Sequence, residues 1–203
     1  MATVTALASS NTGRTGYGSP SNIANAYTDT TSTNYAQLPL AKNATCGIYF
    51  TGFNFSSIPS NARITGITVK FKGCVTSTTS NIVSSATVQA YANTTAKGSS
   101  TSFRSTTASV YTLSVGSWTR AELDTLRIYV YTKCSNKASS SYYTRVYGME
   151  VTVTYEEITQ MLYYKNNGTW VPATKVYQKV SGAWVEVTDL STIDRTKNWV
   201  RGS

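Results

Sequence analysis

The sequence predicts an all-β protein, in which an antiparallel β-sandwich is followed by a small appendage of β-hairpins. Three observations lead to this prediction. Several segments between residues 45 and 157 alternate apolar and polar side chains with a period of two, and only one short segment has the signature of a helix. Near the end of the chain, a tryptophan-containing motif occurs twice with the same spacing. Alternation with period two places one face of each strand in a core, as in a sandwich of antiparallel sheets.

The composition favours a β-rich surface protein over a metabolic enzyme. The chain has 203 residues, which is enough for one substantial domain with its own core plus a small appendage. Charged residues make up 13% of the chain, about half of the usual share of roughly 25%. Ser, Thr, Asn and Tyr are abundant instead. Polar but uncharged strands of this kind are typical of extracellular and virion-surface proteins.

The predicted domain boundary lies at residue 157. Residues 1–157 are expected to form the sandwich domain, and residues 158–203 the hairpin appendage. Within the first domain, residues 1–45 are rich in Ser, Thr, Asn and Gly and are only weakly periodic. We therefore expect a loop-rich start there, with long loops and a few short strands.

The strands of the sandwich are expected in the segments with clear alternation or aromatic content. These segments are "GIYFTGFNF" (47–55), "ITVKFKGCV" (67–75), "ATVQAYA" (86–92), "SVYTLSV" (109–115), "TLRIYVYTK" (125–133) and "YGMEVTVTYEE" (147–157). In the last of them, Met149, Val151 and Val153 are predicted to face the core. Glu150 and Thr152 are predicted to face outward.

A single short helix is predicted just before one of these strands. In "WTRAELDTL" (118–126), Thr119 is followed three residues later by Glu122. This is the spacing of a capping box, in which the two residues satisfy each other's backbone N–H groups at a helix N-terminus. The helix is expected to lead directly into the strand that begins near Leu126.

The C-terminal part contains two predicted hairpins with a common pattern, "YYKNNGTWVPA" (163–173) and "VYQKVSGAWVEV" (176–187). The matching pairs are Tyr163 and Tyr177, Lys165 and Lys179, Gly168 and Gly182, Trp170 and Trp184, and Val171 and Val185. Asn-Gly and Ser-Gly are strong signals for two-residue turns, because glycine tolerates the positive φ angles that tight hairpins require. A fragment of the pattern, "KNWVR" (197–201), follows.

The tryptophans of these hairpins need a surface to pack against, because an isolated hairpin of this size is only marginally stable in water. Three alternatives are open: the hairpins cover an edge of the sandwich, they form a docking arm to a virion or a sister subunit, or they are ligand-binding repeats. The docking hypothesis assigns attachment to the aromatic residues of the repeats. These residues are Tyr163, Trp170, Tyr177, Trp184 and Trp199.

Several segments resemble a known family. "FSSIPSNARITGITVKFKG", "SWTRAELDTLRIYVYT" and "RVYGMEVTVTYEE" are similar to recurring pieces of a jelly-roll-like β-sandwich in virion proteins of tailed bacteriophages. In that family an "IP-x-x-A-x-I-x-G-I" motif leads a strand and a "V-x-V-x-Y" strand closes the domain. The terminal Lys-x-x-Gly-x-Trp hairpins resemble short C-terminal repeats of phage minor tail and other virion proteins. The resemblance covers about residues 45–157 and the hairpins, and it implies a jelly-roll-like sandwich with a structural role in a virion.

The acidic and nucleophilic residues argue against catalysis and against a metal or other cofactor. The chain has no histidine, which excludes Ser-His and Cys-His nucleophile systems and any His-containing metal site. A glycosidase needs two carboxylates that face one cleft. Glu122 and Asp124 belong instead to the capped turn, where carboxylates favour the helix N-terminus, and Glu156 and Glu157 point to opposite faces of a strand. We therefore predict a protein that is not an enzyme.

The net charge of +9 is spread over the chain. Lysines and arginines occur singly, without the stripe or tail that is typical of nucleic-acid binding, so we predict no nucleic-acid partner. A diffuse positive field would instead help the protein dock on an acidic partner surface.

The N-terminal sequence indicates the cellular compartment in which the protein is made. "MATVTALASSNTGRTGYG" lacks the charged start and the apolar run of a signal peptide, and no later segment approaches membrane-spanning length. We expect synthesis in a host bacterial cytoplasm, final location in the virion, and no membrane insertion.

Cys46, Cys74 and Cys134 show no paired spacing. Buried thiols are the favoured interpretation, with a bridge between two of them as the alternative.

One strand carries a candidate contact face. Arg127, Tyr129, Tyr131 and Lys133 alternate with apolar residues, so they are predicted to share the outer face of this strand. Aromatic and basic side chains together either stack on sugars or pack on proteins. Two alternatives stay open: a face covered by a loop or a neighbouring subunit, and a glycan-binding platform.

Together these observations predict a non-enzymatic bacteriophage virion structural protein on the particle exterior, as a minor tail, head-decoration or fibre component. The C-terminal hairpins would attach it to other virion proteins of the capsid, neck or tail. The alternative is a carbohydrate-binding adhesin module that recognises host-surface glycan. A homotrimer is a further hypothesis, because identical subunits commonly assemble as closed rings and the surface is tyrosine-rich with little charge.

Overall fold

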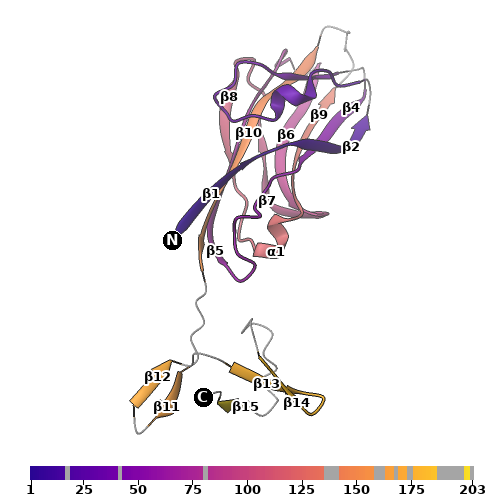
Figure 1. Ribbon diagram of the computed structural model, residues 1–203. Coiled ribbons are helices and arrows are strands. Elements are labelled where there is room, and N and C mark those ends of the chain that lie inside the picture. The colour runs from indigo at the N-terminus through magenta and orange to yellow at the C-terminus, as the bar shows by residue number, and fades with distance from the viewer. Residues whose placement is uncertain are drawn as a thin grey trace. The chain divides into compact units, whose positions relative to one another are not determined.

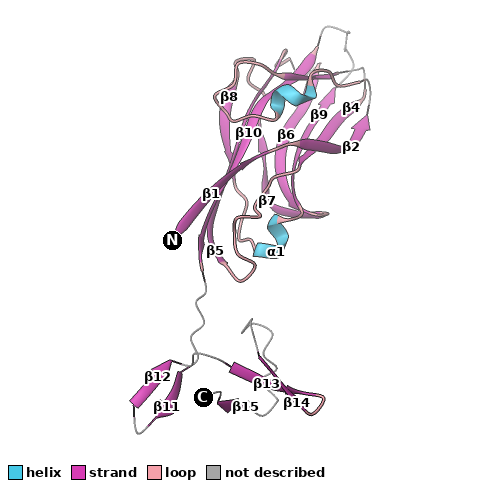
Figure 2. Ribbon diagram, in the orientation of Figure 1, coloured by secondary structure: helices cyan, strands magenta, loops and turns pink. Residues whose placement is uncertain are grey.

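The computed structural model describes residues 1–16, 19–40, 43–79, 82–134, 142–157, 163–166, 169–172, 176–186 and 199–201. The chain divides into two compact units, Met1–Glu156 and Glu157–Ser203. Both are built mainly of strands (Figure 2).

The first unit is a sandwich of antiparallel strands (Figure 1). Its strands are β1 (Ala2–Leu7), β2 (Ser10–Gly16), β3 (Ala36–Pro39), β4 (Thr45–Thr51), β5 (Arg63–Val75), β6 (Val83–Ala92), β7 (Thr95–Ser102), β8 (Ser109–Leu113), β9 (Leu126–Cys134) and β10 (Tyr143–Glu156). Among the described residues, two short helical segments interrupt them, the 3-10 turn η1 (Ile23–Ala26) and the helix α1 (Arg120–Leu123).

The strand order is that of a jelly roll. Sheet A has the order β1-β10-β5-β8, with β3 also paired to β10, and sheet B has the order β2-β4-β9-β6-β7. From β3 onward, the strands pair as a long hairpin that is rolled up: β3 with β10, β4 with β9, β5 with β8 and β6 with β7. This arrangement gives the two four-stranded sheets of a jelly roll. The predicted jelly-roll-like sandwich is therefore confirmed.

The beginning of the chain contains more strand than expected. β1 pairs with β10 in sheet A, and β2 pairs with β4 in sheet B, so residues 2–16 run along an edge of both sheets. At the crossing point, the Ser9 N–H donates to the Thr51 carbonyl at 3.0 Å. The long loops predicted for residues 1–45 are confined to the stretch between β2 and β3 and to the approach to β4. Edge strands that bury few side chains show little alternation in sequence, which explains the difference.

The core lies between the inner faces of the two sheets. Its largest fully buried side chains include Phe50, Phe71, Phe103 and Met149. The predicted inward residues of β10 are fully buried, while the outward ones are half-buried. The segment 47–55 is only partly a strand, because β4 ends at Thr51. Its remaining aromatic residues lie in a loop but are still part of the core.

The predicted helix and its cap are present. The Glu122 N–H donates to the Thr119 hydroxyl at 3.3 Å, and the Thr119 N–H donates to a Glu122 carboxylate oxygen at 2.8 Å. The guanidinium of Arg120 donates to the carbonyls of Ile58 and Phe55 at 3.0 and 3.2 Å. These bonds fasten α1 to the loop that precedes β5.

The second unit contains two hairpins with the same register. Its strands are β11 (Tyr163–Asn166), β12 (Thr169–Pro172), β13 (Val176–Val180), β14 (Ala183–Glu186) and β15 (Trp199–Arg201). Lys165 lies opposite Trp170 in the first hairpin, and Lys179 lies opposite Trp184 in the second. The sequence repeat therefore corresponds to a structural repeat.

The turn of the second hairpin has the predicted geometry. Ser181 and Gly182 both have positive φ angles, 49° and 88°, as a two-residue type I′ turn requires. The fragment at the end of the chain adds a third strand to this hairpin, because β15 pairs with β13.

The three cysteines are buried, as the sequence indicated. Within the described residues, no helix is long and apolar enough to cross a membrane.

Candidate functional site

The predicted contact face of β9 lies on the outer surface of sheet B. Arg127, Tyr129 and Tyr131 are half-buried and alternate with buried core residues, and Lys133 is exposed at the end of the same row. The register of the neighbouring strands extends this row sideways. Tyr49 of β4 lies opposite Tyr129, and a residue of β6, Tyr91, lies opposite Arg127.

Four tyrosines and one arginine form a continuous cluster, which we call the tyrosine face: Tyr49, Tyr91, Tyr129, Tyr131 and Arg127. The rings of Tyr49 and Tyr129 are stacked, with centroids 4.3 Å apart and planes 24° apart. Tyr91 meets both rings edge-on, at 5.8 and 6.3 Å. The Arg127 guanidinium lies 5.4 Å from the Tyr49 centroid. Stacked and edge-on rings at these distances attract each other beyond the area that they bury.

Glycine residues let these rings lie close to the backbone. A Cβ atom at Gly47 would lie only 2.7 Å from Cζ of Tyr129, so the Tyr129 ring occupies the space above β4 that a side chain would fill. A Cβ atom at Gly13 of β2 would lie 3.1 Å from Cδ2 of Tyr49. The tyrosine face is therefore a layer of rings that lie against neighbouring strands.

Polar contacts fix the border of the tyrosine face. Arg127 donates to the side-chain oxygen of Asn93 at 2.8 Å, and the Tyr91 hydroxyl donates to Oε1 of Gln89 at 3.3 Å. Burial, with a smaller effect of Tyr49, raises the pKa of Tyr91. This phenol therefore stays protonated at neutral pH. The face offers aromatic surfaces, hydroxyls and one guanidinium, which suit stacking and hydrogen bonding rather than acid–base chemistry.

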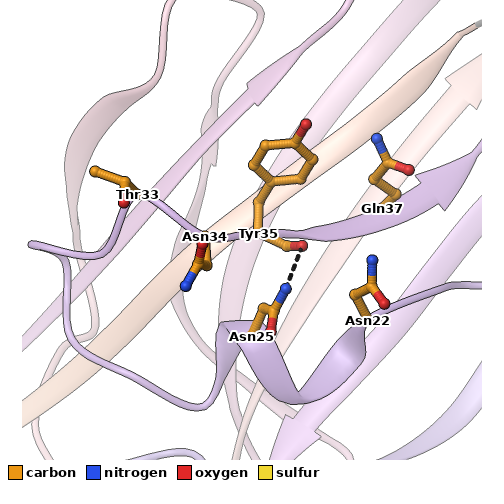
Figure 3. A pocket seen from close by; sticks show the side chains of 6 residues that line it. All are labelled: Asn22, Asn25, Thr33, Asn34, Tyr35 and Gln37. Atoms are coloured by element: carbon orange, nitrogen blue, oxygen red, sulfur yellow. Dashed lines mark hydrogen bonds between the residues drawn. The ribbon is translucent and has the colours of Figure 1, made fainter.

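A second candidate is a polar depression of about 280 Å³ beside η1 and β3, which we call the amide pocket (Figure 3). Its lining residues are all uncharged: Asn22, Asn25, Thr33, Asn34, Tyr35 and Gln37. The side-chain amide of Asn25 donates to the Tyr35 carbonyl at 3.2 Å. Figure 3 shows the Tyr35 ring pointing away from Asn25. That ring packs near Tyr147 and Arg145 instead.

The sequence indicated part of the tyrosine face and none of the amide pocket. Alternation alone places the β9 residues on one face, but it does not say which residues of β4 and β6 lie beside them. Tyr49 and Tyr91 do alternate with buried neighbours, which was an available signal. The amide pocket joins two stretches without periodicity, and their approach depends on reciprocal backbone hydrogen bonds of 3.0 Å between Ser21 and Gln37.

The predicted attachment residues lie in the second unit. Trp184 is 44% exposed, and its neighbour Val185 is 49% exposed. Lys179 lies across the hairpin with its Nζ 5.8 Å from the Trp184 ring centroid, and Tyr177 is half-buried. The side chains of Tyr163, Trp170 and Trp199 are outside the described part of the structure, although their backbones form strands.

Several acidic side chains of the sandwich serve in ion pairs. Lys97 contacts Glu122 at 2.9 Å, Lys70 contacts Glu150 at 3.0 Å, and Arg120 contacts Asp124 at 2.6 Å. The hydrogen bond from Lys97 and that from the Thr119 backbone lower the pKa of Glu122. Among the described residues, no three Cys, Asp or Glu side chains come together as metal ligands would.

Comparison with known proteins gives one distant structural likeness. No family model and no curated protein matches the sequence. Among solved structures, the chain is similar to the CBM36-1 domain of a multidomain xylanase from the hindgut metagenome of Trinervitermes trinervoides. The identity is 12% and the TM-score is 0.34, over 75% of this chain and 97% of that domain. A likeness of this degree carries no conclusion about function.

Proposed function

We propose that this chain is a non-enzymatic structural protein on the exterior of a tailed-phage virion, attached through its C-terminal hairpin unit. The observation that carries the proposal is the exposure of Trp184 and Val185 on a compact unit that is separate from the sandwich. The sandwich core already includes the end of β10, where Tyr155 is buried. The hairpin unit is therefore not needed to bury the end of β10.

Exposed tryptophan on a small hairpin is energetically unfavourable unless a partner covers it. Burying a large apolar side chain stabilises by about 2 to 3 kcal/mol, and tryptophan is enriched among the residues that dominate interface affinity. In the backbone register of the two hairpins, Lys165 lies opposite Trp170 and Lys179 lies opposite Trp184. Two equivalent contacts on one chain would raise the effective affinity for a repetitive surface such as a particle.

The sandwich topology and the sequence resemblance support the same proposal. Jelly rolls are frequent among viral capsid and lectin domains. The pieces that resemble phage virion proteins lie in β5, in α1 with β9, and in β10. β10 pairs with β5, and Arg120 of α1 donates to the loop that precedes β5. Fold alone does not determine function, so attachment has to be tested directly.

The test is incorporation into particles. A chain truncated after Glu157 should fold and stay soluble, yet be absent from purified particles. Trp184→Ala in the full chain should weaken incorporation by at least about 2 kcal/mol, or roughly thirtyfold, as expected for a buried aromatic anchor. Val110→Ala is the matched control, because Val110 is an equally exposed apolar residue on the sandwich (51%), and incorporation should be unchanged.

Two outcomes would contradict the attachment proposal. If the truncated chain unfolds, the hairpins contribute to the sandwich core and are no docking unit. If the truncated chain folds and still enters particles, attachment lies in the first 157 residues. If the full chain is found in no phage particle, the proposal that it is a virion protein is itself wrong.

The tyrosine face favours a second candidate function, the binding of host-surface glycan. Aromatic rings beside hydroxyl and guanidinium groups are suited to stack on sugar rings and to hydrogen-bond their hydroxyls. Replacing both Tyr129 and Tyr131 with Ala should then abolish binding to host cells or glycan arrays. Replacing both with Phe keeps the rings and should preserve most of the binding. Loss of stability without any loss of binding in the Ala variant would assign these rings to a structural role.

A further inference from the structure

We propose that the amide pocket binds a single neutral sugar residue. The inference rests neither on attachment through the hairpins nor on the tyrosine face, because the pocket is formed by η1 and the stretch that leads into β3. Four observations carry it: the unused hydrogen-bonding groups of the lining, their fixed backbone, the absence of charge from the lining, and the size of the depression.

The lining offers hydrogen-bonding groups that the protein itself does not use. In the described part of the chain, the side-chain amides of Asn22 and Asn34, which are exposed, and of Gln37, which is half-buried, have no hydrogen-bond partner within the protein. Each amide presents a carbonyl acceptor beside an NH₂ donor. Adjacent hydroxyls of a sugar also donate and accept side by side, so the two patterns are complementary.

The backbone beneath these side chains is held in place. Ser21 and Gln37 exchange both backbone hydrogen bonds at 3.0 Å. The Asn25 N–H donates to the Asn22 carbonyl at 3.0 Å, and the Asn34 N–H donates to the Ser32 hydroxyl at 3.2 Å. A lining on a fixed backbone loses less conformational freedom when a ligand binds, which favours affinity.

The charges in and near the pocket select a neutral ligand. Calcium sites are built around carboxylates, and the lining contains none. Asp29, in the same segment, accepts hydrogen bonds from the N–H and the hydroxyl of Thr31. An acidic sugar would need a cationic side chain in the lining, and the six lining residues include none.

The depression is large enough for one sugar ring. Its volume of about 280 Å³ is just below the range of roughly 300 to 1,000 Å³ typical of sites for drug-sized ligands. The lining is almost entirely polar, so affinity depends on hydrogen bonds between the ligand and the protein. These bonds replace hydrogen bonds that both make to water. Such bonds are individually modest, and we expect a dissociation constant on the order of 1 mM.

The test is an NMR titration of the full chain with methyl glycosides of glucose, galactose, mannose and N-acetylglucosamine. At least one glycoside should shift the side-chain amide signals of Asn22, Asn34 and Gln37 in a saturable way. Replacing both Asn34 and Gln37 with Ala should weaken that binding about tenfold, since at least two modest hydrogen bonds are lost. Tyr131→Ala, on the tyrosine face, is the control and should leave the titration unchanged.

Asn34→Asp separates a sugar site from a cation site. The variant keeps the shape of the side chain but replaces the NH₂ donor with a charged oxygen, so sugar binding should weaken. Saturable shifts with CaCl₂, strengthened in Asn34→Asp, together with no response to the glycosides, would overturn the proposal. So would a response to glucuronate alone, no saturable shift with any of the four glycosides, or unchanged binding in the double Ala variant. None of these results bears on incorporation into particles, which depends on the other unit.

Discussion

The outer faces of the two sheets differ in chemistry although both sheets bury the same kind of inner face. The central strand of sheet B alternates core Ile128 and Val130 with tyrosines, and that of sheet A alternates core Val151 and Val153 with Glu and Thr. On sheet A, the hydroxyls of Thr152 and of Thr5 on β1 lie 3.0 Å apart. From Glu150 to Thr154, the outer face of β10 carries threonines and an ion pair, whereas Arg145 and Tyr147 of the same strand cluster with Tyr35. The layer of four tyrosine rings lies on sheet B.

The two faces also differ in what lies on them. On sheet A, the segment after η1 crosses the strands: the Met149 N–H donates to the Thr28 carbonyl at 2.9 Å, and Lys72 donates to the Ser32 carbonyl at 2.8 Å. On sheet B, the tyrosine rings lie against the backbone at Gly47. Near Gly148, sheet A is thus covered by main chain, whereas near Gly47 sheet B is covered by the Tyr129 side chain, which can rotate. The following substitutions test this difference.

Gly148→Ala should have the largest effect. A Cβ atom at Gly148 would lie 2.7 Å from the Thr28 carbonyl oxygen and still closer to that of Asp29. Because the obstacle is backbone, we expect a loss of about 3 kcal/mol in the free energy of unfolding, measured by urea denaturation. Gly47→Ala is the counterpart on sheet B, where the obstacle is the Tyr129 ring. It should cost about 1 kcal/mol, and equal losses at both glycines would contradict the contrast between the faces.

Tyr129→Ala should have the next largest effect. The ring is half-buried and contacts three other tyrosines, so we expect a loss of about 2 kcal/mol in the free energy of unfolding. Thr152→Ala is the matched change on sheet A and should cost less than about 1 kcal/mol, the value of a modest hydrogen bond. If Tyr129→Ala lowers the free energy of unfolding no more than Thr152→Ala does, the tyrosine face does not stabilise the fold. Its rings would then have another role.

The smallest expected effects concern ion pairs at the two sheets. Lys97 of β7 contacts Glu122 and lies 5.1 Å from the Trp118 centroid, while Lys70 contacts Glu150 on a more exposed surface. Lys97→Ala should cost up to about 1 kcal/mol in the free energy of unfolding, and Lys70→Ala less than about 0.5 kcal/mol. Thermal unfolding at pH 7 would measure both. A larger loss from Lys70→Ala would contradict this order.

The pH dependence of the same variants gives a second test. The hydrogen bond from Lys97 lowers the pKa of Glu122 in the folded protein. Its contribution to stability is therefore complete above the ordinary glutamate pKa and is lost as the pH falls through the lower folded value. Lys97→Ala should make the stability fall less steeply in this acidic range. Lys70→Ala should leave the contribution of Glu122 unchanged.

Alternation in the sequence was sufficient to predict the strands that bury many side chains. β9 and β10 show strict period two, and the capping box located α1 through Thr119 and Glu122. β7 was missed, and β1, β2 and β3 were expected only as unlocated short strands within residues 1–45, because edge strands such as "TAKGSSTS" bury few large apolar residues. The paired turn signals and the repeat were sufficient to predict the hairpins of the second unit.

The candidate sites were less predictable, because they depend on register and on contacts between distant segments. Period two places Arg127, Tyr129 and Tyr131 on one face, but only the pairing with β4 and β6 brings Tyr49 and Tyr91 beside them. The amide pocket depends on one bridge between Ser21 and Gln37. A pattern within a single segment carries no information about such a bridge.

The place where the chain leaves the sandwich has a mechanical consequence. β10 ends at Glu156 and is hydrogen-bonded along its length to β5 on one side, and to β1 and β3 on the other. A pulling force transmitted through the chain beyond Glu156 therefore enters the sandwich on an interior strand of sheet A. A pull along the axis of β10 would put the hydrogen bonds on both sides of this strand under shear at the same time. They would not break one after another, as they do when a strand is peeled from a sheet. A particle that carried this protein by its C-terminal unit would thus hold the sandwich by one of its most firmly bound strands.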